Sequence, residues 1–154
     1  MKKIILLLLA FSLGLSSFAS DETEIKQFFN SFVDAGNTYR SDYFNFYSET
    51  PRIERIVIKK DGSKKSVIVP ISEFKKHSKL NMKLGKLRRY KNYYSNIQIA
   101  SVGEDYKIST MRRPSTSDYS LPAHFIVGKD KNGHWKIKEE SMQTKVQTFL
   151  KEKS

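Results

Sequence analysis

Apolar side chains recur with the spacing of an amphipathic helix near the amino end of the chain. They are Ile25, Phe28, Phe29, Phe32 and Val33. This spacing puts one wide apolar stripe on a helix that we expect from Asp21 to Val33. Acidic residues open this segment, where negative charge suits the helix dipole. A second short helix, rich in aromatic residues, is expected from about Thr38 to Tyr47.

The rest of the chain is dominated by β-rich runs separated by turn residues. Runs at 53–59 and 66–70 flank the turn sequence Lys60-Asp61-Gly62-Ser63 and predict a hairpin. Polar, glycine-containing turns also separate four later runs, which predicts an antiparallel meander. These later strands are expected at 96–102, 106–112, 121–128 and 134–142.

A third helix is expected between the hairpin and the meander. It would run from Glu73 to about Tyr90, with Ser72 as its amino-terminal cap. The apolar row expected to be buried is Phe74, His77, Leu80, Leu84 and Leu87. A short carboxyl-terminal helix is expected to hold Val146, Phe149 and Leu150.

The order of these elements predicts the fold class. Helices gathered at one end and strands at the other indicate an α+β fold rather than an α/β fold. We expect amphipathic amino-terminal helices packed in a curved, mostly antiparallel sheet, which makes a cone-shaped roll. No linker or internal repeat divides the chain, so residues 20–154 are predicted to be a single domain.

The first nineteen residues have the pattern of a cleavable export signal. Lys2 and Lys3 precede an apolar run from Ile4 to Leu15, and Ser17 and Ala19 fit a small-residue cleavage site. A membrane-spanning helix needs about 20 apolar residues, which is more than this run provides. We therefore expect a signal peptide at 1–19 and a periplasmic or secreted product.

Composition narrows the chemistry that the chain can perform. It has no cysteine, which excludes disulfides, thiolate metal sites and a cysteine nucleophile. His77, His124 and His134 are far apart in the sequence and have no carboxylate at ligand spacing, so we predict no metal site. The sequence also has no glycine-rich phosphate loop, and we predict no cofactor.

The formal net charge of +12 is concentrated in one stretch of the chain. From Phe74 to Gly103 there is no acidic residue. The basic residues of this stretch, which form the predicted basic face, are Lys75, Lys76, Lys79, Lys83, Lys86, Arg88, Arg89 and Lys91. Basic side chains near tyrosines suit an anionic partner, although such runs are also common on solvated helix faces. For an exported protein the expected partner is an envelope surface or an acidic protein rather than nucleic acid.

The aromatic helix pair, the hairpin, the third helix and the closing strand Gly133-His134-Trp135-Lys136-Ile137 resemble the nuclear transport factor 2-like superfamily. The resemblance covers roughly residues 21–144. It implies a cystatin-like cone. That superfamily includes ketosteroid-isomerase-like and polyketide-cyclase-like enzymes and many non-catalytic ligand-binding modules, so the resemblance indicates the fold more than the function.

Strand alternation suggests which side chains would line such a cone. Trp135 and Ile137 are expected to point inward, which puts Glu139 in phase with them. The predicted binding pocket consists of Tyr39, Tyr43, Tyr47, Tyr106, Arg112, Trp135 and Glu139. Glu139 among aromatic rings is a candidate general base, and a structural ion pair between Arg112 and Glu139 is the alternative.

These observations favour an exported, non-catalytic domain that binds a small amphipathic ligand or a protein segment in an aromatic-lined cone. One alternative is an interaction module that uses the basic face against an anionic envelope surface or an acidic protein partner. A second alternative is a small acid–base enzyme of isomerase or cyclase type, which would use Glu139. Assembly into a homodimer is also open.

Overall fold

The computed structural model describes the backbone of residues 2–151 and the side chains from Ala19 to Lys151. Two α-helices, six strands and two short 3-10 turns follow one another along the described chain. They are α1 (Lys2–Asn37), η1 (Tyr43–Phe46), β1 (Tyr47–Ile58), β2 (Lys64–Val69), α2 (Ile71–Arg88), β3 (Asn92–Val102), β4 (Asp105–Pro114), β5 (Leu121–Lys129), β6 (Trp135–Thr144) and η2 (Gln147–Lys151).

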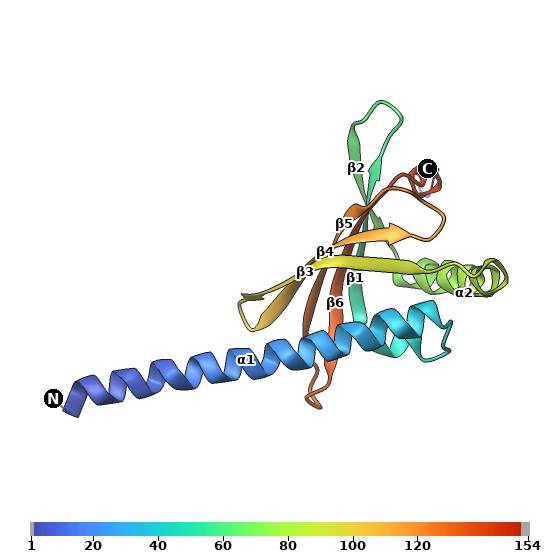
Figure 1. Ribbon diagram of the computed structural model, residues 1–154. Coiled ribbons are helices and arrows are strands. Elements are labelled where there is room, and N and C mark those ends of the chain that lie inside the picture. Colours follow the sequence, from blue (N-terminus) through green and yellow to red (C-terminus); the bar gives the residue numbers. More distant parts are fainter. Residues whose placement is uncertain (1, 152–154) are drawn as a thin grey trace.

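The strands form one sheet in the order β2-β1-β6-β5-β4-β3. Strands β1 and β6 are parallel, and every other neighbouring pair is antiparallel. The sheet is strongly twisted, and the second half of α1 lies across it while the first half extends past its edge (Figure 1). The predicted α+β architecture with a curved, mostly antiparallel sheet is confirmed.

The apolar stripe of α1 faces the sheet and forms the core with it. Ile25, Phe29 and Phe32 are buried. The rings of Phe29 and Phe32 lie 5.1 Å and 5.6 Å from the ring of Phe125 on β5. Phe28 and Val33 are partly buried beside them. The helical spacing in the sequence therefore identified the packing face of this helix correctly.

The segment interpreted as a signal peptide, residues 1–19, runs into α1 without a break from residue 2 onward. Met1 and the side chains before Ala19 lie outside the described part of the structure. Within the described residues, no helix combines the length and the apolar character needed to cross a membrane.

The predicted second helix at 38–47 is wrong. Helix α1 ends at Asn37, and Tyr39 adopts a left-handed conformation with φ of 59°, which reverses the chain direction. Only η1 is helical in this segment, and Tyr47 already belongs to β1.

The third predicted helix is present as α2, but its buried face differs from the prediction. Its amino-terminal cap is Pro70, with no side-chain hydrogen bond, so Ser72 does not cap it. The buried residues of α2 are Phe74 and Gly85. The remaining residues of the predicted buried row are exposed: His77, Leu80, Leu84 and Leu87. The reason lies at Gly85, where a Cβ atom would come within 3.1 Å of the Tyr39 ring, so this side of α2 packs on the end of α1.

The predicted hairpin and the four meander strands are confirmed. Strand β1 pairs with β2, and β3 begins at Asn92, which is earlier than expected. The carboxyl-terminal helix is present only as the short turn η2, where Phe149 packs against the core.

Candidate functional site

A β-bulge in β6 decides which carboxylate enters the core. Ile137 pairs with Val127 and Glu139 pairs with Ile126, so Lys138 is an extra residue without a partner on β5. The Lys138 ammonium group lies 2.7 Å from Asp105, and the contact crosses Gly128. A Cβ atom at Gly128 would lie 2.0 Å from the Asp105 carboxylate, so a larger residue here would have to displace the Asp105–Lys138 contact.

Because the bulge shifts the alternation by one residue, the inward orientation predicted for Glu139 is wrong. The Glu139 side chain is 48% exposed on the outer face of the sheet, where it lies 3.7 Å from Arg52. Its neighbour Glu140 is 1% exposed and faces the core. The alternative of an Arg112–Glu139 ion pair is also not formed, because Arg112 donates instead to Asn92 at 2.8 Å.

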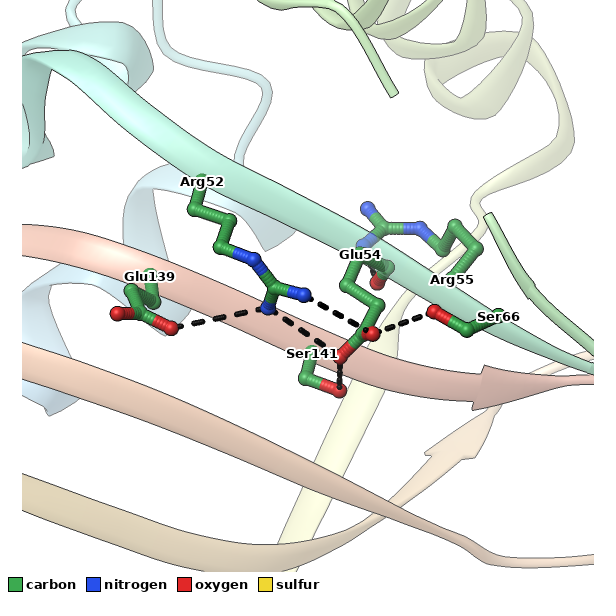
Figure 2. A network of polar contacts seen from close by, with 6 residues as sticks. All are labelled: Arg52, Glu54, Arg55, Ser66, Glu139 and Ser141. Carbon is green, nitrogen blue, oxygen red and sulfur yellow. Dashed lines mark hydrogen bonds and ion pairs between the residues drawn. The ribbon is translucent and has the colours of Figure 1, made fainter. Parts of the chain in front are cut away.

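The outer face of β1, β2 and β6 carries a polar network centred on Glu54. Its carboxylate accepts hydrogen bonds from Ser66 and from Ser141, the latter at 2.8 Å, and forms an ion pair with Arg52 (Figure 2). The hydrogen bond from Ser66 is the main cause that lowers the pKa of Glu54. The Glu54 carboxylate has partners on both oxygens, so the network joins three strands and leaves no acceptor poised for a substrate.

A second polar cluster lies on the core face, around Glu140. The carboxylate accepts a hydrogen bond from the Tyr47 hydroxyl and one of 2.6 Å from Arg55. The Tyr43 hydroxyl lies 3.1 Å from that of Tyr47, which extends the chain of hydrogen bonds. Burial, reinforced by the charge of Glu140, raises the pKa of both tyrosines. Burial acts to lower the pKa of Arg55, but the charge and hydrogen bond of Glu140, together with the nearby Tyr47 and Tyr43, outweigh it, and the pKa is raised.

The cone around this cluster is filled by aromatic side chains. Phe32 stacks on Tyr43 at 5.2 Å and contacts Tyr47 at 5.8 Å, and Tyr47 in turn contacts Phe74 at 5.3 Å. A void of about 20 Å³ remains at the mouth, lined in part by Tyr43, Asn92 and Tyr94. That is room for roughly one water molecule. With both Glu140 oxygens occupied and no space beside them, the geometry offers a substrate no access to this carboxylate.

Two residues of the predicted pocket lie at the other end of the sheet. Tyr106 donates a hydrogen bond of 2.7 Å to Asp21, and Trp135 donates one of 2.9 Å to Glu24. Their rings are 5.7 Å apart and pack against the side of α1. The hydrogen bond to Asp21 raises the pKa of Tyr106 to about 12. Tyr106 and Trp135 therefore lie apart from Tyr43 and Tyr47, and only the latter two contact each other in the core.

The remaining predicted tyrosine, Tyr39, lines a groove between the end of α1 and α2. Its single hydroxyl proton is shared between the backbone carbonyls of Gly85, at 2.9 Å, and Tyr90, so it is not free to be donated to a ligand. The groove has a volume of about 270 Å³. Its lining residues are Tyr39, Arg40, Ser41, Phe44, Lys79, Met82 and Lys83.

This groove combines apolar walls with positive charge. Phe44 and Met82 supply apolar surface, while Lys79 and Lys83 form no ion pair with any residue that the structure describes. Arg40 is already bound to Asp42 through a hydrogen bond of 2.9 Å. The sequence placed both lysines on the basic face, but it held no signal for the groove, which depends on the left-handed turn at Tyr39.

Comparisons with known proteins identify the fold. No protein-family model matches the sequence, and no curated protein matches it either. A nuclear transport factor 2-like protein of unknown function from Pseudomonas putida superposes with a TM-score of 0.63, at 12% identity, over 81% of this chain and 87% of that one.

Two further solved structures have the same architecture. A nuclear transport factor 2-like protein with a cystatin-like fold from Novosphingobium aromaticivorans gives a TM-score of 0.62 at 7% identity, over 82% of this chain and 83% of that one. A protein with a cystatin-like fold from Nostoc punctiforme gives a TM-score of 0.57 at 13% identity, over 81% of this chain and 91% of that one. The chain therefore has the cystatin-like fold of the nuclear transport factor 2-like proteins.

Proposed function

We propose that the chain is an exported, non-catalytic domain that binds a small anionic amphiphile in the groove between α2 and the end of α1. The observation that carries the proposal is one groove that combines the apolar side chains of Phe44 and Met82 with two ammonium groups, on Lys79 and Lys83. Neither ammonium group has an ion-pair partner among the described residues. The fold alone does not select a function, because it carries many.

The groove has the composition expected of a ligand site rather than of a solvated cleft. Ligand pockets are mostly apolar, with a few polar groups that fix the orientation of the ligand. Here Phe44 and Met82 would contact a short hydrocarbon portion, and Lys79 and Lys83 would contact a carboxylate or phosphate head. A volume of about 270 Å³ suits a head group with a short chain.

The proposal departs from the expected cone pocket because the cone is filled. It also favours binding over acid–base catalysis, because the core carboxylate of Glu140 is already held by Tyr47 and Arg55. Export rests on the leader pattern of residues 1–19, with a periplasmic or secreted product after cleavage following Ala19.

Calorimetric titration of the purified chain with hexyl phosphate, below its micelle concentration, tests the groove. We expect saturable binding that weakens by about tenfold or more in the Lys79→Gln/Lys83→Gln variant, since a hydrogen bond to a charged group is lost. The matched control is Lys64→Gln/Lys65→Gln, at exposed positions of β2. Absence of binding, or equal weakening in both variants, would overturn the proposal.

A further inference from the structure

Helix α2 exposes a row of leucines to solvent. Leu80, Leu84 and Leu87 are 55%, 41% and 82% exposed. Their spacing puts them along one side of the helix, turned away from the buried side that Phe74 and Gly85 mark. A contiguous exposed apolar row of this kind usually marks an interaction surface.

Positive charge borders the leucine row, which occupies the second half of the helix. The only acidic residue of α2 is Glu73 in its first turn, and its carboxylate contacts Lys76 and His77. Every charged residue from Phe74 to Arg88 is basic. A helix with leucines on one side and lysines beside them is typical of segments that lie in the interface of an anionic membrane.

The position of α2 in the fold leaves this surface open. The helix projects from the sheet and packs at its ends, through Phe74 and through the contact between Gly85 and Tyr39 (Figure 1). The leucine row therefore faces away from the described body of the protein.

We propose that α2 docks on an anionic lipid bilayer, with Leu80, Leu84 and Leu87 inserted among the acyl chains and the flanking lysines on the head groups. The proposal does not depend on a ligand in the groove. A symmetric pairing of two copies through this helix would bring like charges together, which disfavours a homodimer here. The convex leucine row also lacks the concave shape that receives a peptide, whereas a bilayer fits it.

Vesicle sedimentation tests the docking surface. The chain should partition onto vesicles that contain phosphatidylglycerol and not onto phosphatidylcholine vesicles, and high salt should weaken the binding, because exposed charges are screened. Leu84→Ser/Leu87→Ser should reduce partitioning by about tenfold or more, because insertion of each leucine transfers several methylene or methyl groups from water into the acyl chains. The matched control is Ile68→Ser/Val102→Ser, which changes exposed apolar residues outside α2.

Charge variants complete the test and distinguish vesicle docking from ligand binding in the groove. Lys76→Glu/Lys86→Glu, at positions outside the groove lining, should abolish vesicle binding and leave saturable hexyl phosphate binding in place. Vesicle binding that is unchanged in the leucine variant, or equally weakened in its control, would overturn the proposal. So would a leucine variant that turns a dimer into a monomer while vesicle binding persists.

Discussion

Arg55 donates a hydrogen bond of 2.6 Å to Glu140, and the carboxylate that accepts it is 1% exposed. The guanidinium group also lies 5.8 Å from the ring centre of Phe74 and 5.9 Å from that of Phe149. The Arg55 side chain is only 11% exposed, so water can replace the lost partner of either charge only in small part. The two residues are therefore interdependent, and removal of either leaves the other as an uncompensated charge in an aromatic core.

Glu140→Ala should destabilise the protein by about 3–5 kcal/mol, because it leaves Arg55 buried without a counter-ion. The adjacent Glu139→Ala is the matched control, and it should change stability by at most about 1 kcal/mol, as expected for an exposed ion pair. Urea denaturation at neutral pH measures both. Equal effects at the two positions would contradict the assignment of Glu140 to the core.

The double variant Arg55→Met/Glu140→Leu should recover most of the stability lost in Glu140→Ala. Replacing a buried ion pair with apolar residues of similar volume is often neutral, whereas breaking it is strongly destabilising. The same denaturation series gives the comparison. A double variant as unstable as Glu140→Ala would mean that the loss comes from packing rather than from the unpaired charge.

Trp135→Ala should cost less stability than Phe125→Ala. Phe125 is fully buried against α1, so its truncation is expected to cost about 3–5 kcal/mol. Trp135 is only partly buried, against Tyr106, and about 1–2 kcal/mol is expected. Thermal melts of the two variants rank them directly. A larger loss for Trp135→Ala would place this ring deeper in the core than the structure does.

Glu54→Gln should reduce stability by roughly 1–2 kcal/mol at neutral pH, through weaker hydrogen bonds to Ser66 and Ser141. The pKa of Glu54 is lowered in the folded state, so its contribution is complete above the usual value of 4.5 and is lost as the pH falls through the lowered pKa. The gap between wild type and variant should therefore shrink on acidification.

Melting temperatures measured from neutral to acidic pH test this behaviour. Glu49→Gln is the control, since Glu49 is exposed on the same strand. The difference in melting temperature between Glu49→Gln and wild type should stay near zero over the whole pH range. A Glu54→Gln gap that grows at low pH would have the wrong sign for a carboxylate with a lowered pKa.

The precursor expressed in a bacterial host should lose residues 1–19 and appear in the periplasm or medium with Ser20 as its first residue. The reason is the pattern of a basic start, a short apolar run and a small-residue site. Amino-terminal sequencing and cell fractionation check it. The control is Ala19→Pro, which blocks such a site and should leave the longer form. An intact Met1 in the wild-type product would contradict the interpretation.

Much of the fold could be predicted because it depends on local periodicity. The stripe from Ile25 to Val33 and the turn at Lys60–Ser63 determine their elements from neighbouring residues alone. The wrong predictions depend on contacts between distant segments. The buried side of α2 is set by the contact of Gly85 with Tyr39, and neither residue signals the other in the sequence.

The candidate site shows the same division. Tyr43 and Tyr47 face the core as expected, but their acidic partner is Glu140 rather than Glu139. Strict alternation along β6 could not reveal this, because the extra residue at Lys138 is recognised only from its pairing with β5. Because Glu139 and Glu140 are neighbours, either alternation of β6 puts a glutamate toward the core, and the sequence alone does not distinguish the two.

The bulge at Lys138 also determines how β6 would tolerate changes in length. Deletion of Lys138 would remove the unpaired residue and leave Ile137 and Glu140 on the core face, at the expense of the ion pair with Asp105. Deletion of Glu139 would have the same effect, whereas deletion of a residue from Glu140 to Gln143 would turn part of the buried set toward solvent. The strand therefore has a two-residue segment, Lys138-Glu139, in which loss of either residue conserves the pattern of side chains inside the cone.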